Sequence, residues 1–304
     1  MSKLLVVVAG PTASGKTALA IELAKKFNTV IVSADSRQFY KELTIGTAKP
    51  THLELGQAKH YFINSHSISE DLNAGAYADA ALDLLKKLFL TNDIVILAGG
   101  SGLYIDALIN GIDDLPETDP VLREELNRIY KEEGLDKLRD LLKQSDPDSL
   151  KNIDINNPRR ITRALEVTIS TGTPYSTLLG KKEISFPWPW LITGIYWERE
   201  KLYQRINERV QHMIIQGLKE ETIAVMAHRN KNALRTVGYK EMFEHIDGNL
   251  SLEETIELIA KNTRNYAKRQ MTWFKRYKEM LWIHPEDEKS LFETIAQKLK
   301  DSTK

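Results

Sequence analysis

The feature that most constrains this chain is an octapeptide near its start, Gly10-Pro11-Thr12-Ala13-Ser14-Gly15-Lys16-Thr17. It matches the pattern G-x-x-x-x-G-K-[ST], in which backbone N–H groups and the positive end of a helix surround a phosphate. The apolar run 4–9 predicts a buried parallel strand before the motif, and helical spacing over 17–27 predicts a helix after it. The octapeptide therefore predicts a polyphosphate-binding loop (P-loop), with Lys16 on a terminal phosphate and Thr17 on Mg²⁺.

Two further apolar runs predict strands that end beside this loop. The run 29–34 is followed by Asp35-Ser36-Arg37-Gln38, and the run 94–98 is followed by Gly99-Gly100-Ser101-Gly102. Ligands of open parallel sheets bind beyond the carboxyl ends of the strands, so both segments are expected beside the phosphate. Asp35 is then placed to bind Mg²⁺ through water or to act as a general base, with a helix N-cap or turn as the structural alternative. The glycines predict a backbone that approaches a ligand closely.

Strands and helices alternate along most of the chain. Residues 45–50 predict a loop, 60–64, 191–197 and 281–284 predict strands, and 74–90 and 288–299 predict helices. Residues 119–149 are helical in pattern without a strand-like run, and residues 117–154 hold eleven acidic and seven basic side chains. Residues 173–189, with three prolines, predict an irregular return. The expected fold is α/β: a P-loop NTPase-like parallel sheet flanked by helices over 1–114 and 190–304, with an all-helical insertion domain over 115–189.

Two groups of arginines predict anion binding. A helix is predicted to begin at Pro158, with Arg159 or Arg160 on the same face as Arg163, three or four residues later. Cations at a helix start oppose the helix dipole, which favours a bound anion, although a solvated basic face is the alternative. In a second helix, over 199–217, Arg205 and Arg209 lie one turn apart and can clamp a phosphate, unless they pair with nearby glutamates.

A third basic segment, residues 258–278, carries seven Lys and Arg side chains and no acidic one, with aromatic residues between them. Such a helix is typical of a nucleic-acid surface, although most of its aromatic residues fit a protein core equally well. The whole chain has 42 basic and 42 acidic residues, so net charge alone predicts no polyanionic partner.

Other classes of protein are excluded by composition. The sequence has no Cys, which excludes disulfides, cysteine nucleophiles and cysteine-based zinc sites and agrees with a cytoplasmic protein. The N-terminal apolar run is too short to span a membrane and lacks a signal-peptide cleavage site. The residues alone leave three classes open: a nucleoside or nucleotide kinase, an NTP-driven nucleic-acid enzyme, and a transferase with diphosphate as its leaving group.

The chain resembles the bacterial tRNA dimethylallyltransferase (IPP transferase) family. The matching stretches run in order over nearly its whole length: GPTASGKT at Gly10, SADSRQFY at Ser33, IGTAKP at Ile45, AGGSGLY at Ala98, NPRRITRALEV at Asn157, RINERVQHM at Arg205, RTVGYK at Arg235 and AKRQMTWFKR at Ala267. The absence of Cys separates it from family members that carry a C-terminal zinc finger. Position 101 is Ser here, where the hydroxyl of a Thr is common in the family.

The resemblance implies transfer of a dimethylallyl group from dimethylallyl diphosphate to N6 of adenosine 37, in tRNAs that read codons beginning with U. It implies Asp35, Thr17 and Arg209 as catalytic residues, with Mg²⁺ at Thr17. The loop from Gly10 to Thr17, with Arg205, is expected to bind the prenyl donor. The anticodon stem-loop of tRNA is expected to contact Asp35, Ser36, Arg37, Gln38, Ser101, Arg123, Arg159, Arg160, Ile161, Thr162, Arg163, Arg235, Thr236, Val237, Gly238, Tyr239 and Lys240.

The alternative is a free-nucleotide enzyme, either an adenylate isopentenyltransferase or a kinase. Its P-loop would be the same, but a free nucleotide needs no basic surface beyond its own pocket. The arginines at 159–163 and the basic segment 258–278 therefore favour tRNA. A monomer in the cytoplasm is expected.

Overall fold

The computed structural model describes residues 3–113, 115–116, 119–180, 186–285 and 287–301. Within them the chain divides into two compact units, residues 1–109 with 186–304 (unit 1) and residues 110–185 (unit 2). Unit 1 contains the sheet and unit 2 is helical. The boundaries of unit 2 lie a few residues before those expected for the insertion, 115–189. Residues 181–185 of the predicted irregular return lie outside the described part.

The sheet of unit 1 has six strands in the order β3-β2-β4-β1-β5-β6, and every neighbouring pair is parallel. The predicted α/β class is confirmed. The third strand is shorter than expected because Phe62 and Asn64 have positive φ angles of 59° and 55°, which interrupt an extended backbone. The strands are β1 Leu4–Ala9, β2 Ile31–Ser33, β3 His60–Tyr61, β4 Ile94–Gly99, β5 Trp190–Ile195 and β6 Leu281–Ile283.

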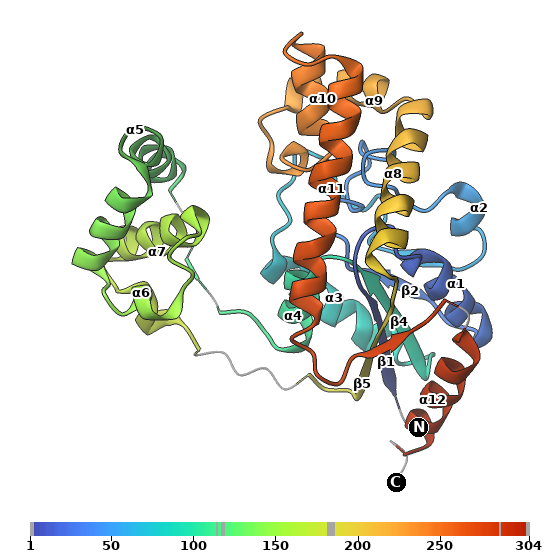
Figure 1. Ribbon diagram of the computed structural model, residues 1–304. Helices are drawn as coiled ribbons and strands as arrows, with labels where there is room; N and C mark the ends of the chain where they lie inside the picture. The colour runs from blue at the N-terminus through green and yellow to red at the C-terminus, as the bar shows by residue number, and fades with distance from the viewer. Residues whose placement is uncertain (1–2, 114, 117–118, 181–185, 286, 302–304) are drawn as a thin grey trace. The chain divides into compact units, whose positions relative to one another are not determined.

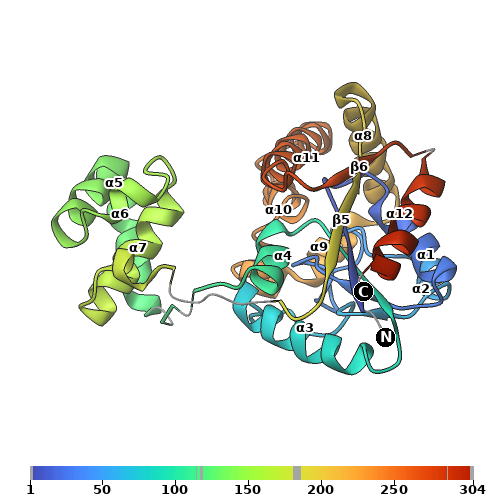
Figure 2. The same cartoon turned by 90° about the horizontal axis from the view of Figure 1, so that it is seen from below.

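Helices cover both faces of this sheet (Figure 2). The helices α1 (Lys16–Lys26) and α12 (Glu288–Asp301) pack on one face, and α3 (Ala74–Leu88) and α4 (Gly102–Ile109) lie on the other. All six residues of β1 are completely buried, as the run of apolar residues predicts for a central parallel strand. The P-loop leaves the carboxyl end of this fully buried strand.

Two long helices, α8 (Arg199–Ile215) and α11 (Leu252–Phe274), run side by side above the carboxyl edge of the sheet (Figure 1). Leu202 and Ile206 of α8 and Ala267 of α11 form a small core with Ala13 of the P-loop. Helix α11 begins six residues before the predicted basic segment, at a capping box of Ser251 and Glu254. The remaining helices of this region are α2 His52–Leu55, α9 Leu218–Ala224 and α10 Tyr239–Ile246, with short 3₁₀ turns at Met226–His228 and Asn232–Leu234.

Unit 2 consists of α5 (Pro120–Ser145), α6 (Ser149–Asn152), α7 (Pro158–Thr171) and a 3₁₀ turn at Tyr175–Leu178. Asp119 and Asn157 cap α5 and α7, and each cap is followed by Pro at the first helical position. The predicted helix start at Pro158 is confirmed. The axis of α5 breaks at Gly134, which has a φ of 84°. The core of unit 2 is formed by apolar side chains of α5 and α7, among them Leu126, Leu138, Leu142, Ile161 and Leu165.

Candidate active site

The P-loop has the conformation that an anion requires. Gly15 has a φ of 99°, a left-handed conformation that turns the chain into α1. The first N–H groups of a helix have no partner within it, so those at the start of α1 are directed at the loop. Ser14 is 1% exposed, and its hydroxyl is one of two buried side-chain polar groups without a partner among the described residues. A buried, unpaired hydroxyl in a phosphate loop fits a ligand that supplies the missing acceptor.

Side chains from α8 and α11, and from the segment after β5, hold the P-loop from outside. Trp197 Nε1 donates to the Ser14 carbonyl at 2.8 Å, and Arg205 Nε donates to the Ala13 carbonyl at 2.8 Å. The Arg205 guanidinium also stacks on the Trp197 ring, 4.5 Å from its centroid. Arg209 Nη1 donates to Thr12 Oγ1 at 3.2 Å. The predicted arginine pair therefore contacts the P-loop itself. Glu208, one of the glutamates near these arginines, accepts a hydrogen bond from Gln204 instead.

Lys16, Arg205 and Arg209 together make the loop strongly positive. Part of the Lys16 side chain reaches solvent, but its Nζ is folded back onto the Pro11 carbonyl at 2.6 Å. Burial and the nearby charge of Arg209 lower the pKa of Lys16 to about 7, opposed by Asp35. Burial, with the charge of Arg205, also lowers the pKa of Arg209. The lowered pKa values of Lys16 and Arg209 show that their charged forms lack a counter-charge here, which favours a bound anion.

Asp35 lies at this positive site, as its place after β2 predicts. A small cavity of about 40 Å³ is lined by Lys16 and Thr17 of the P-loop and by Asp35 and Gln38 of the β2 loop, with residues of β2, β3 and β4. Asp35 Oδ1 accepts the N–H of Arg37 at 3.0 Å, which fixes the orientation of the carboxylate. The predicted juxtaposition of P-loop and carboxylate is confirmed. No helix begins here, so Asp35 is not a helix cap, but its bond to the N–H two residues later is the turn contact of the structural alternative.

The loops after β2 and β4 are bonded to each other. Ser36 N donates to Ser101 Oγ at 2.9 Å, and Ser101 N donates to the Ala34 carbonyl at 3.3 Å. A Cβ on Gly99 would lie 2.2 Å from the Ala34 carbonyl oxygen, so this glycine permits a close approach of two protein segments. Gly99 also lines the cavity beside the P-loop, and a close approach to a ligand there stays a prediction.

The side chains at the predicted magnesium position are of the types that bind Mg²⁺. Thr17 and Ser33 present hydroxyl groups and Asp35 a carboxylate around one cavity, and Mg²⁺ prefers oxygen ligands. No group of three His, Cys, Asp or Glu side chains with the geometry of a metal site occurs among the described residues. A P-loop magnesium site does not need such a cluster, because phosphate oxygens and water complete it.

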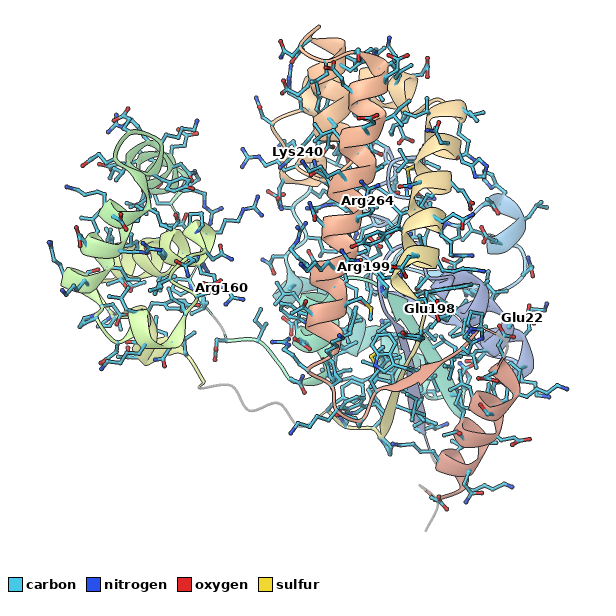
Figure 3. All side chains as sticks on the ribbon, in the orientation of Figure 1. Glu22, Arg160, Glu198, Arg199, Lys240 and Arg264 are labelled. Atoms are coloured by element: carbon cyan, nitrogen blue, oxygen red, sulfur yellow. The ribbon has the colours of Figure 1, made fainter. Side chains whose placement is uncertain are left out.

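The segment 235–240 combines exposed cations with a buried anchor. Arg235 and Lys240 are exposed, and Lys240 projects from the start of α10 (Figure 3). Tyr239 is completely buried, and its hydroxyl donates to Glu221 of α9. Its ring is therefore not available for the predicted RNA contact. Thr236 and Val237 are partly buried, and Gly238 is buried.

Glu221 is a residue that the sequence reasoning did not single out. Its carboxylate accepts three successive backbone N–H groups, those of Thr44, Ile45 and Gly46, at 2.8–2.9 Å. This fixes the loop 45–50, whose Thr47 and Ala48 carbonyls accept from Gln38 Nε2 at 3.3 and 3.2 Å. Helix α9 is thereby connected to the β2 loop that carries Asp35.

In unit 2 the predicted RNA-binding residues divide into two kinds. Arg159 and Arg160 are exposed at the first turn of α7, where Figure 3 labels Arg160, whereas Ile161 and Thr162 are buried. Only the backbone of these two is available for RNA contact. Arg123 and Arg163 both approach the carboxylate of Glu166, which is 1% exposed. Arg123 Nη2 donates to Glu166 Oε2 at 2.9 Å, and Arg163 Nη2 donates to the Pro116 carbonyl at 3.0 Å.

The basic segment of α11 has one buried and one exposed side. Phe274 and Tyr277 are core residues, so the alternative interpretation holds for these aromatic side chains. Arg264, labelled in Figure 3, donates to Asn207 of α8. Arg276 pairs with Asp106 of α4, so these two cations also bind protein groups. Lys261, Lys268, Arg269, Lys275 and Lys278 are exposed.

Two residues of α11 contact the site without having been predicted. Gln270 bonds both the P-loop and the β4 loop. Its position, three residues after Ala267 and four before Phe274, places a polar residue on the buried face of the helix, and this was the available signal. Tyr266 is 37% exposed, yet burial of its hydroxyl and the charge of Asp35 raise its pKa to about 12.

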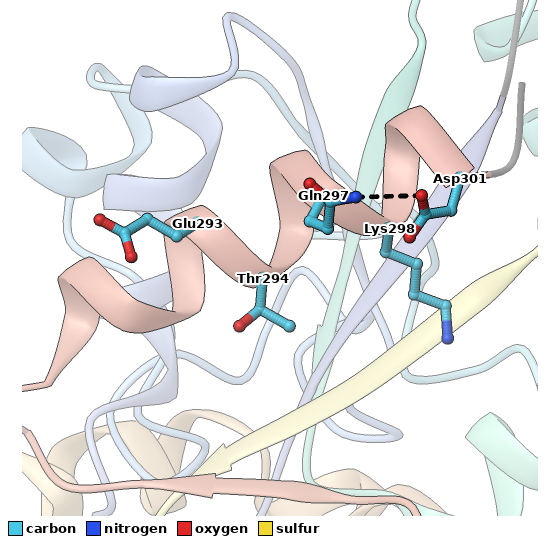
Figure 4. A pocket seen from close by; sticks show the side chains of 5 residues that line it. All are labelled: Glu293, Thr294, Gln297, Lys298 and Asp301. Carbon is cyan, nitrogen blue, oxygen red and sulfur yellow. Dashed lines mark hydrogen bonds between the residues drawn. The ribbon is translucent and has the colours of Figure 1, made fainter.

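A broad depression elsewhere in unit 1 has none of these features. Its lining comes from a single helix, α12, and Gln297 Nε2 donates there to Asp301 Oδ1 at 3.0 Å (Figure 4). We assign it no ligand. Within the described part of the chain, no helix is long and apolar enough to cross a membrane.

Fold and site together define a P-loop α/β protein with a carboxylate beside its anion site and a separate helical unit. Comparison with known proteins narrows this class. The family model described as IPP transferase matches residues 38–277, and the chain belongs to this family. The match begins after the P-loop and Asp35, so the geometry of those residues is an independent observation.

Individual relatives with similar sequences or structures agree with this family assignment. A tRNA dimethylallyltransferase from Cytophaga hutchinsonii is 46% identical over 301 residues, which cover 99% of each chain. The crystal structure of a tRNA isopentenylpyrophosphate transferase from Bacillus halodurans superposes with a TM-score of 0.74 at 33% identity, covering 100% of this chain and 98% of the other. A eukaryotic dimethylallyltransferase described as acting on tRNA has a TM-score of 0.73 at 28% identity, covering 90% of this chain and 70% of the other.

Proposed function

We propose that this protein transfers a dimethylallyl group from dimethylallyl diphosphate to N6 of adenosine 37 in tRNAs that read codons beginning with U. The products are N6-(dimethylallyl)adenosine and diphosphate. The family membership and the names of the relatives support prenyl transfer to tRNA. The donor, the target atom and the roles of individual residues are supported by the chemistry of the site.

The observation that carries this proposal is the shared cavity of Asp35 with Lys16 and Thr17. A P-loop alone is equally suited to a kinase. A carboxylate with a fixed orientation beside the phosphate position supplies what a prenyl acceptor needs, a base within reach of the atom that attacks.

In the proposed reaction, the bond between C1 of the dimethylallyl group and the diphosphate oxygen breaks, and its electron pair leaves with the diphosphate. Negative charge therefore develops on the leaving group. The N–H groups at the start of α1, together with Lys16, Arg205 and Arg209, are placed to stabilise that charge. Arg205 and Arg209 are bonded to the loop in advance and need little reorganisation, whereas Lys16 must leave the Pro11 carbonyl to reach the diphosphate.

The lone pair of N6 forms the new bond to C1, and the nitrogen must lose a proton. The amine is a weak nucleophile because its lone pair is delocalised into the adenine ring. Asp35 accepts this proton in our proposal. Its Oδ1 already holds the N–H of Arg37, whereas Oδ2 has no partner among the described residues and is the oxygen that takes the proton.

Thr17, with Asp35 through water, would hold Mg²⁺ in this scheme. When bound, the ion neutralises part of the diphosphate charge.

We further propose that the anticodon stem-loop contacts the exposed cations at Arg159, Arg160, Arg235 and Lys240 and the β2 and β4 loops. The target adenine must leave the stack of the anticodon loop to reach Asp35, as enzymes that act on a base generally require. A monomeric enzyme in the cytoplasm is part of the same proposal.

The test is incubation with labelled dimethylallyl diphosphate, Mg²⁺ and either unmodified tRNA or AMP. We expect label on one adenosine of the anticodon loop, and none on a matched tRNA that carries guanosine at position 37. Label on AMP alone would move the protein to the free-nucleotide class. Label on neither acceptor would refute prenyl transfer.

A further inference from the structure

We propose that Gln270 is a positioning residue that sets the shape of the P-loop, and thereby the affinity of the site for the diphosphate group. It lies on α11, more than 250 residues after the loop that it holds. For its activity readout this inference rests on the proposed function, whereas its binding readout does not.

The contacts of Gln270 are short, and the one to Gly100 is buried while the one to Thr12 is partly buried. Its Oε1 accepts the backbone N–H of Thr12 at 2.8 Å, and its Nε2 donates to the carbonyl of Gly100 at 2.8 Å. The residue is 6% exposed. One side chain therefore bridges the loop after β1 and the loop after β4, the two loops that border the phosphate position.

Only a side chain of this length that carries both an acceptor and a donor satisfies both partners. The N–H of Thr12 requires an acceptor and the carbonyl of Gly100 requires a donor, so the orientation of the amide is determined by its surroundings. An ionised glutamate offers acceptors alone, and an aliphatic side chain offers neither group. Either change leaves a buried backbone group unpaired, which is costly in a site closed to water.

The bond to Thr12 also determines how the loop binds its ligand. Because the Thr12 N–H is occupied by Gln270, the phosphate receives its backbone N–H groups from later residues of the loop. The same Thr12 accepts Arg209 through its hydroxyl. Gln270 therefore positions Arg209 indirectly, through the threonine that both side chains hold.

The close packing of Gly100 against the Gln270 amide supports the same contact. A Cβ added at this position would lie 2.4 Å from Gln270 Nε2 and 3.4 Å from the Gly10 carbonyl oxygen. An alanine at position 100 therefore displaces the amide first. The glycine is explained by this contact with Gln270.

The first experiment compares Gln270→Glu and Gln270→Leu with Gln211→Glu, a control that makes the same charge change at an exposed position of α8. Binding of Mg²⁺–diphosphate is measured by calorimetry between about pH 4.5, where a glutamic acid begins to protonate, and pH 8, and the KM for dimethylallyl diphosphate is measured in parallel. We expect both Gln270 variants to bind about tenfold or more weakly at pH 8, as loss of buried hydrogen bonds implies. The control should match the unchanged protein.

The pH dependence separates positioning from general damage. A protonated glutamic acid can accept from Thr12 and donate to Gly100, so it reproduces the amide. We therefore expect the defect of Gln270→Glu, taken as a ratio to the unchanged protein, to shrink as the pH falls, and that of Gln270→Leu to stay constant. Ratios within twofold of unity for both variants, or the same constant defect in both, would overturn the proposal.

A second measurement remains informative if Gln270→Leu does not fold. Gly100→Ala is combined with Gln270→Ala, and diphosphate affinity is measured for both single variants and the double variant. We expect Gly100→Ala to weaken binding severalfold in the presence of Gln270 and by less than twofold in its absence. Additive effects would contradict the contact.

These outcomes are distinguishable from failure of the proposed function. If the unchanged protein does not prenylate tRNA but the affinity for diphosphate follows the pattern above, the inference about Gln270 stands alone. If prenyl transfer occurs with the ordinary donor affinity in every Gln270 variant, the inference fails and the function stands.

Discussion

The arginines beside the P-loop and the arginines of unit 2 are predicted to bind phosphate, but the protein holds them differently. Arg205 and Arg209 are partly buried and are bonded to the Ala13 carbonyl and the Thr12 hydroxyl. Arg159 and Arg160 are exposed at the start of α7. The first pair is desolvated and oriented before any ligand arrives, whereas the second pair is hydrated and free to change rotamer.

This difference corresponds to two kinds of recognition. Stabilising the charge of a leaving group requires fixed donors in a site with little water, since interactions of charges are strongest there. Following a nucleic-acid backbone requires many weak contacts that exchange with counterions, so salt reduces the affinity. We therefore expect substitutions beside the P-loop to change turnover, and substitutions in unit 2 to change tRNA affinity and its dependence on salt.

The largest effect is expected at Asp35, where the two forms of recognition meet at the reacting atoms. Asp35→Asn keeps the shape and the acceptor for Arg37 N–H but cannot take the proton from N6. Single-turnover prenyl transfer should fall by about 10² or more, the usual scale for a positioned base. Asp71→Asn, an exposed carboxylate, is the control. Tight tRNA binding with nearly normal turnover in Asp35→Asn would remove Asp35 from the catalytic set.

The next effect is expected for Arg209. Arg209→Gln removes a cation from the diphosphate site but keeps a donor near Thr12. Turnover at saturating donor should fall by roughly tenfold or more, because charge stabilisation in the transition state is lost, and tRNA affinity should stay unchanged at every salt concentration. Arg199→Gln is the matched change on the same helix, at an exposed residue that stacks on Tyr203. A decrease in tRNA affinity alone would contradict the division drawn above.

A smaller effect, on tRNA affinity rather than on turnover, is expected for the double variant with Arg159→Gln and Arg160→Gln. Filter binding of tRNA between low and moderate salt should show a severalfold loss of affinity at low salt. The slope of log K against log[salt] should be shallower by about 1.5, since each lost phosphate contact contributes somewhat less than one. Turnover of bound tRNA should be unaffected. Lys151→Gln in α6 is the control, because Lys151 is paired with Asp148.

The features of the active site that depend on a local sequence pattern were predicted from the sequence. The P-loop, the strand before it and the helix after it are contiguous, so this strand, loop and helix were predicted correctly. Asp35 was placed by a topological rule, because the carboxyl ends of parallel strands share an edge. Gln270, Trp197 and Glu221 were missed because each contacts a loop that is distant in sequence, by 258 residues in the case of Gln270 and Thr12. Their hydrogen bonds become apparent only when the packing of α8, α9 and α11 is known.

The glycines after β4 show the same limit. Their number indicated close approach, and close approach occurs, but the partner of Gly99 is Ala34. A sequence pattern shows that a side chain is excluded and leaves open which atom excludes it.

The smallest expected effect is the uptake of a fraction of a proton by Lys16 when diphosphate binds. Its pKa of about 7 leaves the amine about half charged at pH 7 in the ligand-free protein and mostly neutral at pH 8. A bound diphosphate favours the charged form, so binding should take up about half a proton at pH 7 and more at pH 8, and affinity should fall as the pH rises above 7. Calorimetry in buffers of different ionisation enthalpy measures this uptake.

Lys16→Arg isolates the contribution of that one group, because an arginine remains charged over this range. The variant should bind diphosphate without the additional uptake, and the protonation of diphosphate itself cancels in the comparison. Equal uptake by both proteins would mean that Lys16 is already charged before the ligand arrives. The cations beside the P-loop would then be hydrated like those of unit 2, and the contrast between the two regions would be lost.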